Sequence, residues 1–275
     1  QTQIPILLVE QTIEYLVYQK YADDFPLFLL KPLLYLDVLK LKLWEKYFWR
    51  KATRLVAMSR EDRYIMLKAT LNQKQIDIVA NGVDVTYFDQ VHHQENHSPT
   101  VLFVGNFKWL PNKDAAIFLA KEIWPHIKRE LPQTQLWIVG ANPTKEIKQL
   151  SKIPDVIVEG EIADIRTAFA KANVLLAPIR NGRGTKYKVL EAMASSVPVV
   201  TTPLGIDGLD VEPGKHALVA TTAPGLASET VNLLKNLPLG QQISHAAKNL
   251  VTQKYNWSTI SQNLDRIYQE LGQKS

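Results

Sequence analysis

Cysteine is absent from the 275 residues of the chain. Disulfide bonds, thiolate nucleophiles and cysteine-ligated zinc sites are therefore excluded together. A chain without cysteine is suited to a reducing compartment, so the sequence favours a cytoplasmic protein.

Long apolar runs are absent as well. The longest candidate, residues 25–43, is interrupted at Lys31, Pro32, Asp37, Lys40 and Lys42. It lacks the ~18 uninterrupted apolar residues of a membrane-spanning helix, so no span is expected. No charged leader precedes the apolar run at residues 4–9, which argues against a secretory signal. The chain begins with glutamine rather than methionine, and this suggests a fragment or a trimmed chain.

A strong charge imbalance is the third missing feature. Lysine and arginine number 32 against 27 acidic residues, a net charge of +5, which is too small to indicate nucleic-acid binding. Apolar residues make up 46% of the chain and charged residues 21%, as in an ordinary globular protein. The length favours two domains.

Apolar runs of strand length alternate with longer segments of helical period, which predicts an α/β, doubly wound architecture. Most runs are continuous rather than alternating, as in parallel strands that are covered on both faces. The predicted strands are residues 5–10, 54–59, 76–80, 100–105, 135–140, 156–160, 173–178, 198–202 and 217–221. The predicted helices are residues 36–50, 60–70, 113–130, 144–150, 164–172, 186–195, 225–235, 241–252 and 258–271.

A polar stretch at residues 89–99 is the clearest change in composition along the chain. We place the domain boundary there, with domains at residues 1–97 and 98–275. The second segment has enough strands for a complete domain. The first has only three, so it is expected to be the later part of an incomplete sheet.

Ligands of open parallel sheets bind beyond the carboxyl ends of the strands, so the loops after strands are the candidate sites. One such loop follows residues 100–105 and contains Gly105, Asn106, Lys108 and Lys113. Glycine lets a ligand approach the backbone, and a helix start offers free N–H groups to an anion. The alternative is a plain turn with Asn112 as a helix cap.

A second loop, residues 179–185, leads into a helix that contains Lys186, Lys188 and Glu191. Helical spacing buries the apolar face and leaves Lys188 and Glu191 together on another face. A diphosphate could meet the helix amides and the lysines, while Glu191 could accept hydrogen bonds from sugar hydroxyls. The alternative is an exposed i,i+3 ion pair of little consequence.

Residues 185–202, followed by Gly205-Ile-Asp-Gly-Leu209, resemble the donor-site signature of family 4 glycosyltransferases of the GT-B fold. Other landmarks of that family have similar segments in the same order, at Phe103-Val-Gly105 with Pro111-Asn112, Trp137-Ile-Val-Gly140, Val156-Ile-Val-Glu-Gly160 and Asn81-Gly-Val-Asp84. The resemblance covers nearly the whole chain. It implies two Rossmann-like domains, the N-terminal one incomplete here, and a last helix that crosses back to the first domain.

The resemblance also implies roles for single residues. Glu191 would hold the donor ribose, and Lys186 or Lys188 would face the diphosphate. The remaining donor-side residues implied are Arg183, Gly184, Thr185, Gly105, Asn106, Lys108 and Ile162, the last beside the base. No cofactor or metal is implied beyond a nucleotide diphosphate sugar as co-substrate.

Two departures from the family pattern stand out. Arg183 occupies the position of the first acid of the family's two-glutamate motif, which normally contacts the donor sugar. Gln11-Thr-Ile-Glu14 resembles a His-Asn-x-Glu step, with Gln11 in place of histidine and Glu14 on the acceptor side. No catalytic base is therefore assigned. The family's first strands would precede Gln1, so the chain alone is expected to be inactive.

Residues 25–54 form a basic amphipathic region with interleaved aromatic residues. Such a region can lie on an anionic membrane as a peripheral contact, or pack on its own sheet with snorkelling lysines. Three histidines and Glu95 within residues 92–97 have no metal-site spacing, so no metal is expected.

The sequence thus predicts a glycosyltransferase of polysaccharide biosynthesis that moves a hexose from a nucleotide diphosphate sugar, such as a UDP-sugar, to a hydroxyl acceptor. The acceptor would be a glycan or a lipid-linked molecule, and the resemblance implies retention of configuration. The alternative is a degenerate nucleotide-binding or scaffold module that needs a partner. Nucleic-acid binding is not expected, since its usual motifs are missing.

Overall fold

The computed structural model describes residues 4–94, 98–182 and 184–273. Its contacts divide the chain into two compact units. The first unit comprises the described residues within 1–81, 183–185 and 258–275, and the second comprises those within 82–182 and 186–257. Each unit is described separately below.

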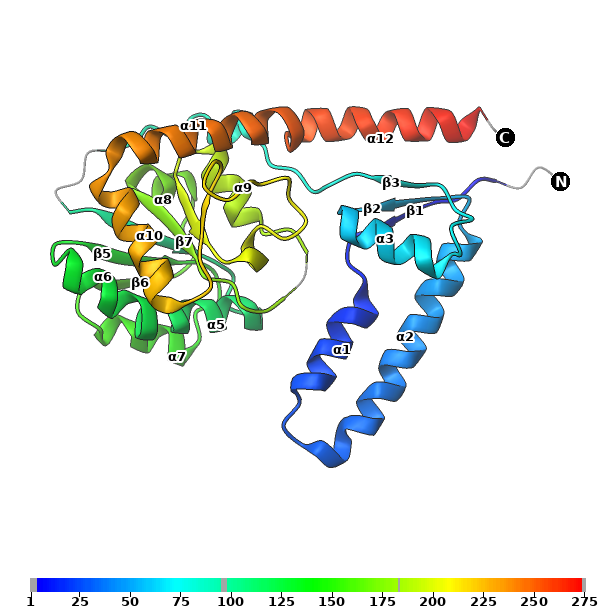
Figure 1. Ribbon diagram of the computed structural model, residues 1–275, viewed down its shortest axis with the longest axis horizontal. Helices are drawn as coiled ribbons and strands as arrows, with labels where there is room; N and C mark the ends of the chain where they lie inside the picture. Colours follow the sequence, from blue (N-terminus) through cyan, green and yellow to red (C-terminus); the bar gives the residue numbers. More distant parts are fainter. Residues whose placement is uncertain (1–3, 95–97, 183, 274–275) are drawn as a thin grey trace. The chain divides into compact units, whose positions relative to one another are not determined.

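The first unit contains a three-stranded parallel sheet in the order β1-β2-β3 (Figure 1). Leu8 lies opposite Leu55, and Leu55 lies opposite Ile76. The strands are β1 (Leu7–Glu10), β2 (Arg54–Ala57) and β3 (Ile76–Ile78), and the helices are α1 (Glu14–Asp24), α2 (Lys31–Lys51), α3 (Arg60–Ala69) and α12 (Trp257–Gly272). A short 3₁₀ turn, η1 (Phe28–Leu30), precedes α2.

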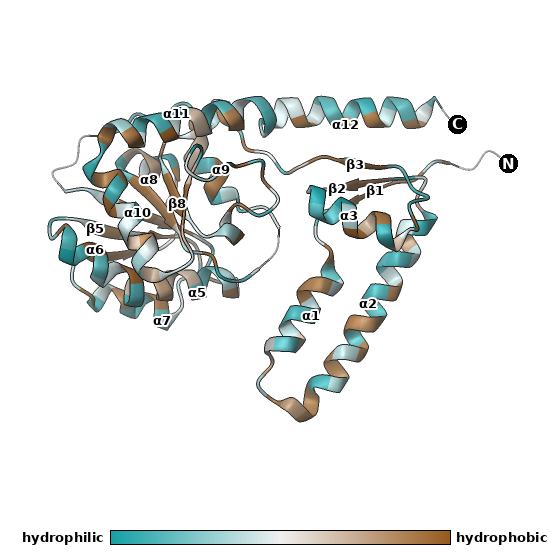
Figure 2. Ribbon diagram, viewed as in Figure 1, coloured by the Kyte–Doolittle hydropathy of each residue, from teal (hydrophilic) through white to brown (hydrophobic). Residues whose placement is uncertain are grey.

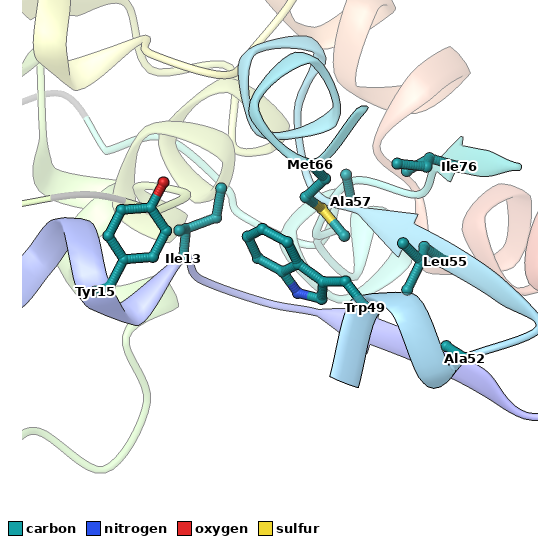
Figure 3. Close-up of a cluster of buried hydrophobic side chains, with 8 residues drawn as sticks. All are labelled: Ile13, Tyr15, Trp49, Ala52, Leu55, Ala57, Met66 and Ile76. Carbon is teal, nitrogen blue, oxygen red and sulfur yellow. The ribbon is translucent and has the colours of Figure 1, made fainter. Parts of the chain in front are cut away.

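Apolar side chains from the sheet and from three helices form the core of this unit (Figure 3). Trp49 of α2 and Met66 of α3 are fully buried there with Leu55 of β2. The Trp49 indole N–H donates to Glu10 Oε2 at 2.5 Å, so the polar edge of the ring is satisfied. Burial raises the pKa of Glu10 to about 7, although this hydrogen bond opposes the shift.

The second unit contains a six-stranded, all-parallel sheet in the order β6-β5-β4-β7-β8-β9. Helices cover both of its faces (Figure 1), and the strands are its most apolar parts (Figure 2). The strands are β4 (Thr100–Val104), β5 (Gln135–Val139), β6 (Val156–Glu159), β7 (Val174–Ala177), β8 (Val199–Thr201) and β9 (Leu218–Val219). The helices are α4 (Val85–Phe88), α5 (Leu110–Phe118), α6 (Trp124–Glu130), α7 (Lys145–Lys148), α8 (Arg166–Lys171), α9 (Tyr187–Ala194), α10 (Ala223–Lys235) and α11 (Leu237–Lys254).

The strand order of this sheet reverses between β4 and β7. From β4 the chain proceeds outward through β5 and β6, and from β7 it proceeds in the other direction through β8 and β9. Such a reversal is a topological switch point, where open α/β sheets bind their ligands beyond the carboxyl ends of the strands. The loops after β4 and β7 therefore border the expected binding position.

Every predicted strand is present, but the helices α1 and α4 were not predicted, and α2 begins earlier than predicted. Helix α1 starts after Ile13, whose side chain provides no cap. Instead, the Glu45 carboxylate of α2 accepts the backbone N–H groups of Glu14 (2.7 Å) and Tyr15 (3.4 Å). Because the capping group lies 31 residues away, no local sequence signal marks this helix. Helix α2 begins at Lys31, five residues before the predicted start at residue 36, and Pro32 lies in its first turn, where proline is tolerated.

The chain passes from the first unit to the second between Asn81 and Gly82. This point precedes the polar stretch at residues 89–99, because the intervening segment packs on the second unit. Val83 forms a parallel bridge with Asn256, and the Lys248 ammonium donates to Asp89 at 2.5 Å. From Ser258 onward α12 belongs to the first unit, where Ile260 and Ile267 join Val56 in a small core.

Across the described parts of the chain, no helix combines the length and the apolar character that crossing a membrane requires.

Candidate functional site

The two loops at the switch point of the second unit are those that the sequence singles out. The loop after β4 contains Gly105, Asn106 and Lys108, and the loop after β7 leads to α9 with Lys188 and Glu191. Gly140 directly follows the neighbouring strand β5. A Cβ atom on Gly140 would lie 1.7 Å from the Gly105 carbonyl oxygen, so the loops after β4 and β5 approach each other more closely than a side chain would allow.

Lys188 is the buried cation of this site, with only 9% of its surface exposed. Its ammonium donates to Asn112 Oδ1 at 2.7 Å and lies 4.4 Å from the centre of the Phe103 ring. Burial lowers the pKa of Lys188 to about 7, an effect that Lys186 reinforces and Glu191 opposes. Within the described residues, the lysine has a neutral acceptor and a ring face but no ion pair.

Glu191 lies one turn further along α9 and is half-buried. Burial raises the pKa of Glu191, and the nearby Lys188 ammonium partly offsets this shift. The exposed Lys188–Glu191 pair considered from the sequence is therefore wrong, because Lys188 is buried. Val189, Leu190 and Met193 form the apolar face as expected and are fully buried.

A network of asparagines joins the loops around Lys188. Asn112 Nδ2 donates to the Asn106 carbonyl oxygen at 2.9 Å. Asn106 Oδ1 accepts from the Lys108 backbone N–H at 3.0 Å and from Asn142 Nδ2 at 3.1 Å. The loops after β4 and β5 are thus linked through polar side chains, and Lys188 connects them to α9.

The loop after β7 is held by α5. Arg180 makes two hydrogen bonds to the Asp114 carboxylate, at 3.1 and 2.7 Å, and Asn181 makes a third at 3.3 Å. Gly182 has a φ of +97°, and a Cβ atom there would lie 2.9 Å from the Pro111 ring. This loop therefore passes close over the start of α5.

The other predicted site residues lie in several places. Lys186 is the N-cap of α9, Lys108 is exposed, and Ile162 is half-buried in the loop after β6. Gly184 and Thr185 group with the first unit, as does Glu14 at the start of α1. Arg183 lies outside the described residues.

Sequence reasoning missed the role of Asn112. The alternative reading of this residue as a helix cap is wrong, because Trp109 is the N-cap of α5 and Asn112 lies inside the first turn. Its partner Lys188 is 76 residues away, so no local pattern connects them. Asp114 and Arg180, 66 residues apart, were missed for the same reason.

A metal site and a surface hollow are the two other candidate sites. In the part of the chain that the structure describes, no group of three His, Asp or Glu side chains is arranged to hold a metal. His93 contacts the Ser195 carbonyl oxygen at 2.8 Å.

A hollow of about 430 Å³ lies on the face of the β4-β5-β6 strands beside Trp137 and Ile157. It also includes Thr100 and Gln135, at the starts of their strands, whereas a switch-point ligand meets the opposite ends.

The fold and the switch-point loops define an α/β protein of the GT-B type. A family model described as "Glycosyl transferases group 1" matches residues 98–236, about half of the chain. The chain belongs to this family.

Individual relatives are more distant. The chain is 26% identical to phosphatidyl-myo-inositol mannosyltransferase from Mycobacterium tuberculosis over 204 residues, covering 70% of this chain and 53% of the relative. It is also 26% identical to an uncharacterized 44.6 kDa protein of the cps region of Klebsiella pneumoniae, covering 58% and 43%. The chain thus spans about half the length of the curated relatives it matches.

Two solved structures show the likeness in fold. Sucrose-phosphate synthase from Thermosynechococcus elongatus has a TM-score of 0.76 at 18% identity, covering all of this chain and 70% of that one. Anabaena HepE, solved in complex with UDP and glucose, has a TM-score of 0.72 at 14% identity, covering 97% and 72%. At these identities the likeness supports the fold alone.

Proposed function

We propose that this chain contains the donor-binding part of a glycosyltransferase that transfers a hexose from a nucleotide diphosphate sugar to a hydroxyl acceptor. The observation that carries the proposal is Lys188, a buried ammonium at the switch point whose hydrogen-bond partner is neutral. A cation in such a position favours an anion, and a diphosphate supplies two negative charges near one helix start.

The chemistry proposed is electrostatic. When the bond between the sugar and the diphosphate breaks, negative charge accumulates on the departing phosphate oxygens. The Lys188 ammonium and the amide groups in the first turn of α9 would stabilise that charge. Lys186 and the loop at Gly105 and Asn106 would border the phosphates, and Ile162 would lie beside the base.

Glu191 would accept hydrogen bonds from the ribose hydroxyls. A carboxylate accepts two such bonds readily when ionised. The Lys188 ammonium opposes the effect of burial on the pKa of Glu191 and so favours the ionised form. The UDP in the solved HepE structure supports UDP as one of the nucleotides to be tested, beside GDP.

Retention of configuration and a hydroxyl acceptor are proposed from membership of the family. The name of the mycobacterial relative specifies a lipid that carries the acceptor, which supports a lipid-linked acceptor for this chain as well. Glu14 of the first unit is proposed to contribute on the acceptor side.

Titration calorimetry with UDP and GDP tests the donor site. We expect one nucleotide to bind, with affinity reduced about tenfold or more in Glu191→Ala, because two hydroxyls would lose a charged acceptor. Glu130→Ala, at an exposed position in α6, is the matched control and should bind normally. Absence of binding by both nucleotides, or equal affinity in Glu191→Ala, would contradict the proposal. Nucleotide binding by the full-length protein without sugar transfer would instead favour a non-catalytic module.

We also propose that the helical hairpin of α1 and α2 contacts an anionic membrane surface. Phe28 and Leu29, between the two helices, are 79% and 87% exposed. Basic residues along α2 outnumber acidic ones, at Lys31, Lys40, Lys42, Lys46, Arg50 and Lys51 against Asp37 and Glu45. Exposed apolar groups beside basic groups suit the interface of an anionic bilayer.

Vesicle co-sedimentation tests this contact. Binding is expected to phosphatidylglycerol-containing vesicles and not to pure phosphatidylcholine vesicles, and should fall in Phe28→Ser/Leu29→Ser. Leu237→Ser removes a side chain that is 67% exposed in the second unit and serves as the control. Equal binding to both kinds of vesicle, or by the double variant, would contradict a specific hairpin contact.

A further inference from the structure

We propose that Asn112 is a positioning residue that aims the Lys188 ammonium at the donor diphosphate while leaving its charge unneutralised. This inference rests on the proposed function, because it assumes that Lys188 meets an anion. It concerns a residue of α5 that no part of the donor-site assignment above includes.

The orientation of the Asn112 amide is set from both ends. Its Nδ2 donates to the Asn106 carbonyl oxygen at 2.9 Å, and that oxygen can only accept. Its Oδ1 therefore has to face Lys188, from which it accepts at 2.7 Å. An amide that is fixed at one end holds a long lysine side chain in one direction.

The backbone at the end of β4 packs directly against Asn112. A Cβ atom on Gly105 would lie 2.9 Å from Asn112 Cγ, so the asparagine side chain lies directly on the glycine. The Asn106 loop is itself held by Asn142, at 3.1 Å. Asn112 is thus supported by backbone and by a polar network, and this support limits its movement.

The choice of an amide matters for charge. An aspartate of the same shape would form an ion pair with Lys188 and would oppose an arriving phosphate. An amide oxygen gives the ammonium a hydrogen bond but no compensating charge. Among the described residues, the charged groups that affect Lys188 are Glu191 on the same helix and Lys186 at its N-cap. From α5, the Asp114 carboxylate is paired with Arg180, and β4 presents the Phe103 ring.

The test compares Asn112→Asp and Asn112→Ala with the unchanged chain by two measurements. The first follows the ¹³Cε resonance of Lys188 with pH in the unliganded protein, assigned by its loss in Lys188→Met. A carboxylate at residue 112 should move the titration midpoint up by about one pH unit or more, and removal of the acceptor should move it down. Opposite shifts in two variants of one residue are not expected of a merely structural role.

The second measurement is UDP affinity at pH 7.5, or GDP affinity if GDP is the nucleotide that binds. Both variants should bind about tenfold more weakly or worse, Asn112→Asp because of repulsion and Asn112→Ala because the lysine is no longer aimed. Asn142→Gly loosens the same loop without touching Lys188 and tolerates the positive φ of +57° at that position. It should leave the Lys188 midpoint unchanged.

The outcomes separate the two proposals. If neither UDP nor GDP binds the unchanged chain, the donor-site proposal fails. If a nucleotide binds but the Lys188 midpoint is the same in all variants, or moves equally in Asn142→Gly, the role of Asn112 is overturned while the donor site stands. Asn112→Asp preserves side-chain shape, so it carries the test should far-ultraviolet circular dichroism show that Asn112→Ala does not fold.

Discussion

Arg54 in the first unit and Lys188 in the second are both buried cations, with 4% and 9% of their surface exposed. Arg54 is paired with two carboxylates. It binds Asp77 through two nitrogens, at 2.5 and 3.0 Å, and Glu270 through a third at 2.7 Å. Lys188 has one amide oxygen and an aromatic ring.

The pKa shifts of these two residues differ in direction for this reason. The Asp77 and Glu270 carboxylates raise the pKa of Arg54, whereas burial lowers the pKa of Lys188 to about 7. The charge of a buried cation that is paired with carboxylates is already compensated, so the cation has no remaining charge to offer a ligand. A buried cation without them is costly to keep charged, and a bound anion removes that cost. The comparison therefore distinguishes a structural cation from a binding one.

Arg54→Met should have the largest effect, and this effect should be on stability alone. It leaves Asp77 and Glu270 without their partner, and breaking such a cluster costs about 3 kcal/mol when the acids remain partly solvated. Denaturant unfolding should show this loss, with Arg54→Lys recovering part of it because the charge remains but the two-nitrogen contact does not. Nucleotide affinity of the folded variant should not change. A stability loss below about 1 kcal/mol would contradict the structural role of the cluster.

Lys188→Met should weaken nucleotide binding without destabilising the unliganded protein. Loss of a charge-assisted contact to the diphosphate is worth about 2–3 kcal/mol, so UDP or GDP should bind about 30–150-fold more weakly. The affinity for the corresponding nucleoside, which lacks phosphate, should change little. Lys235→Met, at an exposed lysine of α10, is the control for loss of one positive charge.

The same substitution should stabilise the unliganded protein near pH 7. The unfolded chain holds a proton on Lys188 up to about pH 10, whereas the folded chain releases it near pH 7. The unfolded state thus binds more protons between pH 7 and 10, and the contribution of Lys188 to stability rises with pH in that window. The advantage of Lys188→Met should therefore shrink as the pH approaches 10. A gain in stability that does not vary with pH would show that the pKa of Lys188 is not lowered in the folded protein.

Glu10→Gln should have the smallest effect and extends the comparison to a buried acid. The pKa of Glu10 is raised from 4.5 to about 7, so the folded state holds more protons than the unfolded one between these values. Its contribution to stability therefore falls as the pH rises from 4.5 to 7. Glutamine still accepts the Trp49 hydrogen bond, so the variant should be more stable at pH 8 by about 1 kcal/mol. Thermal unfolding at pH 5 and pH 8 checks this, and a variant equally destabilised at both values would contradict it.

The sequence predicts those parts of the fold that depend on local pattern. Apolar runs of strand length, most of them continuous, marked the nine strands of the described residues, and loops that combine glycine with lysines near a helix start marked both sides of the switch point. The start of α1 could not be predicted, because Glu45 caps it from another helix.

The candidate site was predictable in position but not in detail. Helical spacing assigned Lys188 to a polar face, yet Phe103 of β4 and Asn112 of α5 enclose it. Lysines are seldom buried, so composition gives no warning of this environment. The asparagine network depends on contacts between loops that only the folded sheet brings together.

Proton uptake on nucleotide binding tests the role of Lys188 most directly. Calorimetric titration of UDP or GDP at pH 7.5, repeated in buffers that differ in ionisation enthalpy, gives the number of protons bound with the ligand. Since Lys188 titrates near pH 7 when unliganded, a diphosphate that restores its charge should take up between about half and one proton. The uptake should disappear in Lys188→Met. Nucleotide binding with no proton uptake, or with the same uptake in Lys188→Met, would show that the diphosphate does not meet this lysine.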